Sequence, residues 1–219
     1  MINYKDCIVP KPWGYEYLFF ENENVGIWFL HINQNEKTSL HCHPNKKTGL
    51  ILLDGNAEIS FLNNKNIMKP LSKTMIWQGV FHSTKSICKN GTQLLEVESP
   101  KDKQDLVRIV DKYGRQNTSY ESENVWLKRK ESSLWFPNEK NFKLSYKNYE
   151  FSTDTLSKEL LLDLNENDII ISLENNLIVT EQNIPVCKIG DVLTVSTLKL
   201  LVLQFKINIQ NNIMIIRNN

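Results

Sequence analysis

The chain has 219 residues, of which 41% are hydrophobic, and its formal net charge is +1 at pH 7. This length and apolar content suit one large or two small domains with a sizeable core, and they exclude a disordered chain. Because basic and acidic residues are interspersed, neither nucleic acid nor an anionic membrane surface is expected as the main partner, and an anionic substrate must be met by local cations.

The first six residues lack the charged start and apolar run of a signal peptide, and no apolar stretch approaches the roughly 20 residues that cross a bilayer. A cytoplasmic protein is therefore expected. The four cysteines form no CxxC pair and are too sparse for a disulfide framework, so they are predicted to be free thiols.

The first half of the chain has the pattern of short strands. Apolar or β-branched runs cover residues 25–32, 49–53, 57–62 and 92–98, and turn residues separate them at 54–56, 63–66 and 89–91. Several short strands at near-regular spacing predict an all-β sandwich or barrel. Helix-like patterns occur at 101–111 and 155–163, both too short for an α/β fold, and residues 120–147 are polar and irregular.

A second run of strands is predicted at 159–164, 168–173, 176–181, 190–195 and 199–207. Its order resembles a degenerate copy of the first half. Because this half contains no histidine, packing, dimerisation or covering of the first barrel is its expected role. The predicted domains are a metal-site barrel at 1–118, a linker with a leading strand at 119–147, and a degenerate β domain at 148–219.

Three of the four histidines form a candidate metal site. His41 and His43 are two residues apart, and on a strand that spacing directs both imidazoles to one face, with Cys42 on the other. His82 follows a turn in a distant segment and adds a third imidazole. Three neutral nitrogen ligands suit a divalent zinc, iron, nickel or manganese ion.

The same residues carry a resemblance to a known superfamily. His41 and His43, Gly55 twelve residues later, and His82 after Gly79 resemble the two motifs of the cupins. This resemblance implies a double-stranded β-helix, or jelly roll, here a bicupin with a degenerate C-terminal barrel. The cupin metal is held by two histidines and a glutamate of the first motif and a histidine of the second.

Two positions depart from the cupin pattern. Thr48 stands where the first motif has its glutamate, and Trp77 stands where the second motif has its proline. Neither Thr48 nor the adjacent lysines replace a carboxylate ligand. The site is then three histidines plus water or substrate, or it binds metal weakly.

A closer resemblance covers roughly residues 8–116. Residues 11–16, 95–100 and 105–115 are similar, in the same order and at similar spacing, to segments of the cupin domain of type II mannose-6-phosphate isomerases, which is often fused to a mannose-1-phosphate guanylyltransferase. The resemblance implies an aldose–ketose isomerase acting on a sugar phosphate. The segment that follows His43 and the whole second half have no match in that family.

Aldose–ketose isomerisation needs a base, a cation that stabilises the enediolate, and a phosphate clamp. Glu96, on a strand interior, is the candidate base, and Tyr113 is a candidate hydrogen-bond donor. Trp77 borders His82 and is a candidate sugar contact. The candidate phosphate ligands are Lys46, Lys47, Arg108 and Arg115.

These side chains also have purely structural interpretations. Glu96 suits a salt bridge at a barrel end, Trp77 suits a core position, and Arg108 and Arg115 suit pairing with Asp105 and Asp111. The main hypothesis is a metal-dependent cupin enzyme of sugar-phosphate or nucleotide-sugar metabolism. The alternatives are a non-catalytic sugar-binding or assembly cupin, and a cupin epimerase or oxygenase. Cupins commonly pair through their sheets, so a homodimer is the oligomer that the resemblance implies.

Overall fold

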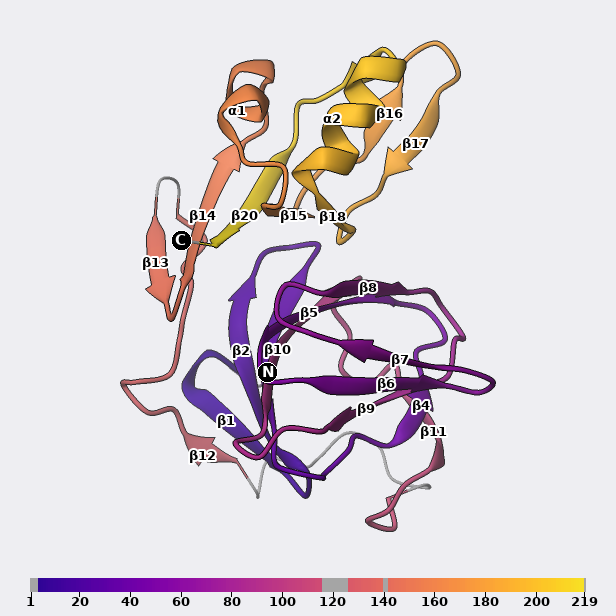
Figure 1. Cartoon of the computed structure of the whole chain (residues 1–219), viewed down its shortest axis with the longest axis vertical. Helices are drawn as coiled ribbons and strands as arrows, with labels where there is room; N and C mark the ends of the chain where they lie inside the picture. Colours follow the sequence, from indigo (N-terminus) through magenta and orange to yellow (C-terminus); the bar gives the residue numbers. More distant parts are fainter. Residues whose placement is uncertain (1–3, 116–125, 140–141, 219) are drawn as a thin grey trace. The chain divides into compact units, whose positions relative to one another are not determined.

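The computed structural model describes residues 4–115, 126–139 and 142–218. The chain forms two compact units (Figure 1). Unit 1 contains Met1–Glu21 and Gly26–Trp135, and unit 2 contains Asn22–Val25 and Phe136–Asn219. The domain boundaries predicted from the sequence, at 118 and 147, stay a prediction.

Unit 1 consists of two antiparallel sheets. In spatial order, the first contains β12 (Leu127–Lys128), β1 (Cys7–Lys11), β2 (Gly14–Glu21), β3 (Gly26–Ile32), β10 (Thr92–Ser99), β5 (Lys47–Asp54) and β8 (Lys73–Ile76). The second contains β11 (Val107–Val110), β4 (Leu40–Cys42), β9 (His82–Ser86), β6 (Ala57–Phe61) and β7 (Lys65–Met68). A short 3₁₀ helix, Tyr4–Asp6, precedes β1.

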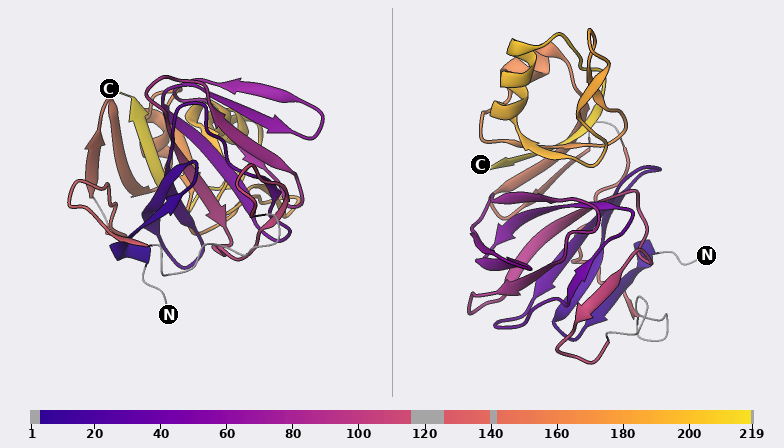
Figure 2. Two further views of the ribbon diagram at one scale, coloured as in Figure 1. Left: turned by 90° about the horizontal axis from the view of Figure 1, so that it is seen from below. Right: turned by 90° about the vertical axis from the view of Figure 1, so that its right-hand side faces the viewer.

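The path of the chain between these sheets defines the fold of unit 1. From β3 to β6 and again from β8 to β11, successive strands alternate between the two sheets, and the β6–β7 hairpin between these two runs stays within one sheet. The strands therefore wind around a common axis as a double-stranded β-helix (Figures 1 and 2). The all-β cupin jelly roll predicted from the sequence is confirmed.

The barrel interior is apolar along part of its length. On β5, the run from Lys47 to Leu53 is buried, as expected of a central strand that packs on both faces. The chain turns from β5 in the first sheet to β6 in the second at Gly55, where φ is +79° and a Cβ would lie 2.6 Å from the Gly91 carbonyl oxygen. The core of unit 1 includes Trp13, Leu18, Trp28, Leu30, Ile32, Leu50, Leu52, Ile59, Ile76 and Leu94.

The helix-like interpretation of residues 101–111 is wrong. Residues 101–106 form irregular chain, and residues 107–110 form β11, which pairs with β4. Val107, Ile109 and Val110 are β-branched, and such side chains fit a strand better than a helix. Pairing with β4 therefore decided that residues 107–110 form a strand and not a helix.

Unit 2 also contains two sheets. The larger one has the order β13 (Lys143–Tyr146), β14 (Tyr149–Thr155), β20 (Asn212–Asn218), β15 (Ile169–Ser172) and β18 (Val192–Thr194). The smaller one has the order β17 (Ile184–Cys187), β16 (Leu177–Val179) and β19 (Ile207–Asn208). Two helices, α1 (Lys158–Asp163) and α2 (Val195–Gln204), complete the unit (Figure 2). A degenerate second barrel stays a prediction.

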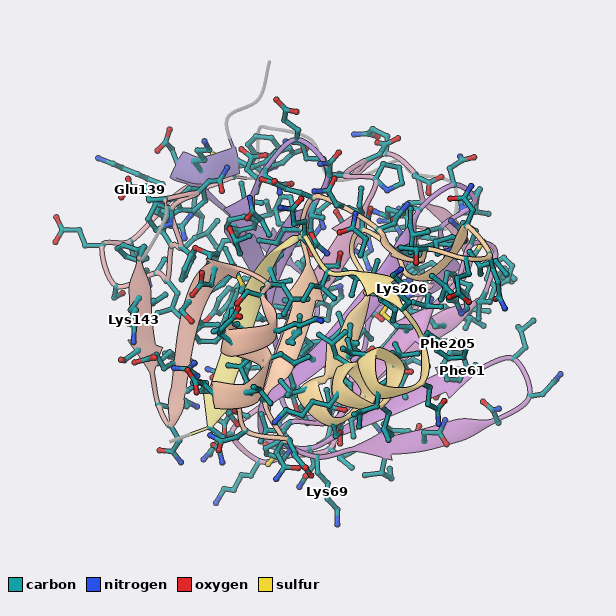
Figure 3. The ribbon with its side chains drawn as sticks, turned by 90° about the horizontal axis from the view of Figure 1, so that it is seen from above. Phe61, Lys69, Glu139, Lys143, Phe205 and Lys206 are labelled. Carbon is teal, nitrogen blue, oxygen red and sulfur yellow. The ribbon has the colours of Figure 1, made fainter. Side chains whose placement is uncertain are left out.

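Two strands predicted in this half are helices instead. Residues 159–164 lie mostly in α1, as the helix-like pattern at 155–163 indicated, because the Ser157 hydroxyl accepts the Leu160 amide and caps the helix. Residues 199–207 lie mostly in α2, capped by Thr194. Phe205, at the C-terminal end of α2, stays 40% exposed (Figure 3). A short apolar run fits both structures, and the caps decided between them.

Among the described residues, no helix has both the length and the apolar character that a membrane span requires.

Candidate metal centre

Strand pairing in the second sheet of unit 1 brings three imidazoles together. His41 lies on β4 directly opposite His82 on β9, and His43 follows β4 by one residue. The ring centroids are 4.4 Å apart for His41 and His82, 5.0 Å for His41 and His43, and 5.5 Å for His43 and His82. One ring nitrogen from each lies within 4.8 Å of the other two. The predicted convergence is therefore present.

Hydrogen bonds set the tautomer of each imidazole. The Nδ1 atoms of His41, His43 and His82 lie 2.8, 2.6 and 3.1 Å from the carbonyl oxygens of Ser39, Asp105 and Val80. A carbonyl oxygen only accepts, so each Nδ1 carries the proton and donates it. Each Nε2 is left with a lone pair, which is the form that binds a metal.

Burial keeps these imidazoles neutral. Burial, with a smaller contribution from nearby Lys46, lowers the pKa of His43 to about 3 and that of His82 to about 4. Burial and the other two histidines hold the pKa of His41 well below its usual value. His43 Nε2 is buried without a hydrogen-bond partner among the described residues. An orphaned lone pair beside two others fits a divalent metal ion.

Glu96 on β10 adds a carboxylate to this group. Its Oε1 lies 4.0 Å from His43 Nε2, and because His43 is neutral this contact is not an ion pair. Burial raises the pKa of Glu96 to about 7, against the lowering effect of Lys103 and with a further rise from Glu98. The sequence predicted Glu96 as the candidate base within a strand, and the structure brings its carboxylate next to His43.

A cavity of about 70 Å³ opens next to the three imidazoles. Arg108, which is paired in register with His41, and Arg115 both line it. Arg115 is held by Asp111, with its Nε 3.0 Å from Oδ2 and an Nη 2.9 Å from Oδ1. Two of the predicted phosphate ligands thus share the cavity with the candidate metal site.

Lys46 also lines the cavity, but it is only 1% exposed. Its Nζ donates to Glu98 at 2.7 Å and to the Asp102 carbonyl at 2.8 Å. The ammonium group is therefore engaged by the protein and faces a carboxylate. Its predicted role in phosphate binding stays a prediction.

Three further predicted residues are not among those that line the cavity. Lys47 is buried with its Nζ 5.6 Å from the centre of the Trp77 ring, and Trp77 is 49% exposed. The Tyr113 hydroxyl donates to Glu36 and, at 3.3 Å, to the Lys37 carbonyl, and burial raises the pKa of Tyr113 to about 12. The structure does not bring these three side chains to the histidines.

A buried ionic cluster that the sequence analysis did not predict lies beside the site. Lys103 lies 3.1 Å from Glu98 and 3.4 Å from Glu16, and its Nζ lies 3.8 Å from the centre of the Trp28 ring. Lys11 lies 3.7 Å from Glu16. Lys11 comes from β1, Glu16 from β2, Glu98 from β10 and Lys103 from the segment after β10. The one sequence signal for this cluster was the two-residue spacing of Glu96 and Glu98, which places both side chains on the same face of β10.

Comparison with known proteins finds distant structural similarities and no sequence match. No family model matches the chain, and no curated protein matches it. Among solved structures, KdgF from Halomonas sp. is 11% identical, with 44% of this chain and 89% of that chain covered and a TM-score of 0.42. An RmlC-like cupin from Shewanella frigidimarina is 13% identical, with 46% and 89% covered and a TM-score of 0.40.

A sugar phosphate isomerase of the cupin superfamily from Silicibacter pomeroyi is 11% identical, with 43% of this chain and 64% of that chain covered and a TM-score of 0.40. Strand topology independently defines unit 1 as a double-stranded β-helix. The barrel carries a buried group of three histidines that suits a divalent metal.

Proposed function

We propose that this protein is a metal-dependent cupin enzyme of sugar-phosphate or nucleotide-sugar metabolism, in its simplest form an aldose–ketose isomerase similar to type II mannose-6-phosphate isomerases. One observation carries the proposal. Three imidazoles present their Nε2 lone pairs to the same cavity that Arg108 and Arg115 line.

Each part of this arrangement suits a step of the chemistry. A divalent ion held by His41, His43 and His82 supplies a Lewis acid for the carbonyl and hydroxyl oxygens of a sugar. The guanidinium group of Arg108 suits a phosphate, because its fork geometry matches the phosphate oxygens. Arg115 adds positive charge to the same cavity, although its Nε and one Nη are held by Asp111. Glu96 is the cavity carboxylate to which the sequence assigns proton transfer, a role that requires it to be free of the metal.

A non-catalytic sugar-binding or assembly cupin is the second candidate. Thr48 in the glutamate position and the Lys46–Glu98 pair, in which a predicted phosphate ligand is already engaged, favour this alternative. An epimerase or oxygenase is the third candidate.

His82→Ala tests the proposed function. Purified wild-type protein is expected to contain close to one equivalent of a divalent metal by elemental analysis, and to turn over at least one member of a panel of sugar phosphates and nucleotide sugars. The variant is expected to lose metal and turnover together, because two imidazoles remain of three. Zinc, iron, manganese and nickel are each measured in the same sample.

His31→Gln is the matched control. His31 stacks on Tyr15 with ring centroids 5.0 Å apart and is not part of the metal group, so metal content and turnover are expected to be unchanged. Wild-type protein that binds no metal would contradict the proposal. Protein that binds metal and sugar without turnover would support the non-catalytic candidate.

A further inference from the structure

The first cupin motif of this chain lacks its carboxylate at the expected place. Thr48 occupies that position on β5, is 0% exposed, and its Oγ1 has no hydrogen-bond partner among the residues that the structure describes. Thr48 also does not line the cavity, whereas Leu50 two residues later does. A short hydroxyl therefore stands where a long carboxylate side chain would enter the barrel.

A carboxylate enters the same cavity from the neighbouring strand. Glu96 on β10 is paired in register with Leu50, one strand away from Thr48 and two residues along. Two ligand atoms bound to one ion, each at about 2.0–2.2 Å, stand at most about 4.4 Å apart. The 4.0 Å between Glu96 Oε1 and His43 Nε2 falls within this limit. The ligand atoms that lie within 4.8 Å of one another belong to the three histidines and not to Glu96, so coordination requires the Glu96 side chain to rotate toward His41 and His82.

The surroundings of Glu96 leave its carboxylate available. Glu96 is 8% exposed, and no described residue forms a hydrogen bond with its side-chain carboxylate. Glu98, on the same face of β10, is instead held by Lys46 at 2.7 Å and by Lys103 at 3.1 Å. Burying a carboxylate without a hydrogen bond or a paired cation destabilises a fold, and a bound metal ion removes that cost.

We infer that Glu96 is the fourth protein ligand of the metal, a carboxylate supplied by β10 in place of the one that β5 lacks at Thr48. The inference rests on the proposed metal-dependent function and changes one part of it. Glu96 coordinates the ion, so it is not the free base that the sequence predicts. The resulting set of three imidazoles and one carboxylate suits zinc, iron and manganese.

The test compares wild type with Glu96→Gln, using Co²⁺ alone as the probe. Gln keeps the shape and removes the charge, so the metal-free variant is expected to melt at or above the wild-type temperature. Its Co²⁺ affinity is expected to fall at least 10-fold, and the visible spectrum of bound Co²⁺ is expected to change. The carboxylate band that shifts in the wild-type infrared difference spectrum on Co²⁺ binding is expected to disappear.

Glu98→Gln controls for the loss of a nearby negative charge without the loss of a ligand. Glu98 lies two residues from Glu96 on the same strand. The Co²⁺ spectrum and the infrared shift of the Glu98→Gln variant are expected to match those of the wild type. Glu96→Gln with wild-type affinity and an unchanged Co²⁺ spectrum would overturn the inference and leave the three-histidine site in place. Wild-type protein that takes up no Co²⁺ would overturn the inference and the proposed function together.

Discussion

At the scale of single residues, the candidate metal site depends on atoms beyond the imidazoles. Each Nδ1 donates to a main-chain carbonyl, and these carbonyls belong to three different segments, at Ser39, Val80 and Asp105. Asp105 acts twice, because its carboxylate also accepts the amides of Asn45 and Lys46 at 2.9 and 2.8 Å. The loop after His43 is thereby held in the position that directs Nε2 into the cavity.

Asp105→Asn is therefore expected to weaken metal binding by about 10-fold, the lower end of the effect of residues that orient metal ligands. The amide retains one acceptor oxygen but presents a donor to a backbone N–H. Competition with a chromophoric chelator measures the affinity. Asp102→Asn is the control, because the Asp102 side chain accepts from Gln104 in the same segment. Equal affinities of the two variants would contradict this role of Asp105.

At the scale of elements, the turn between β1 and β2 positions the charged wall of the cavity. Lys11 and Glu16, which flank the turn, both line the cavity. Gly14 lies at the start of β2 with φ at +148°, and a Cβ there would stand 1.9 Å from the His31 carbonyl oxygen on β3. Only glycine allows β2 to approach β3 this closely.

Gly14→Ala is expected to destabilise unit 1 by about 2 kcal/mol or more, because the two strands must separate to relieve the contact. Gly114→Ala is the matched control, since φ is +75° there and a Cβ meets nothing within 4 Å. Gly114→Ala is expected to lower the free energy of unfolding by about 1 kcal/mol, because alanine is strained in this backbone conformation. Urea denaturation followed by tryptophan fluorescence measures both, and equal losses would contradict the steric explanation.

At the scale of the whole molecule, two spectroscopic signals report on different units. All five tryptophans belong to unit 1, whereas both α-helices belong to unit 2; the tryptophans are Trp13, Trp28, Trp77, Trp126 and Trp135. The three histidines of the candidate metal site also belong to unit 1. Metal binding should therefore stabilise the unit that tryptophan fluorescence follows.

Zn²⁺ at a free concentration of 100 times its Kd is expected to stabilise unit 1 by about 2.7 kcal/mol, since the ion binds the folded unit and not the unfolded one. Thermal unfolding by tryptophan fluorescence should shift upward, and unfolding by helical circular dichroism at 222 nm should not. Addition of a chelator should reverse the shift. A shift of equal size in both signals would contradict independent stabilisation of unit 1.

The sequence by itself determined the features that depend on local spacing. Short strands and turn residues predicted an all-β sandwich or barrel, and the resemblance to the cupin motifs implied the jelly roll. The two-residue spacing of His41 and His43 predicted that their imidazoles share a face, because alternate residues of a strand point to the same side. The segment after His43 was harder to interpret, since the sequence cannot tell a solvent-exposed lysine from a buried one. Lys46, for which phosphate binding stays a prediction, is buried and faces Glu98.

Only the tertiary structure decided the features that depend on strand register and packing. Glu96 lies on β10 and His43 follows β4, and their approach depends on how both sheets close around the cavity. The same holds for Tyr113, whose hydroxyl donates to Glu36. Contacts between distant segments are set by three-dimensional pairing, which the spacing of residues along the chain does not encode.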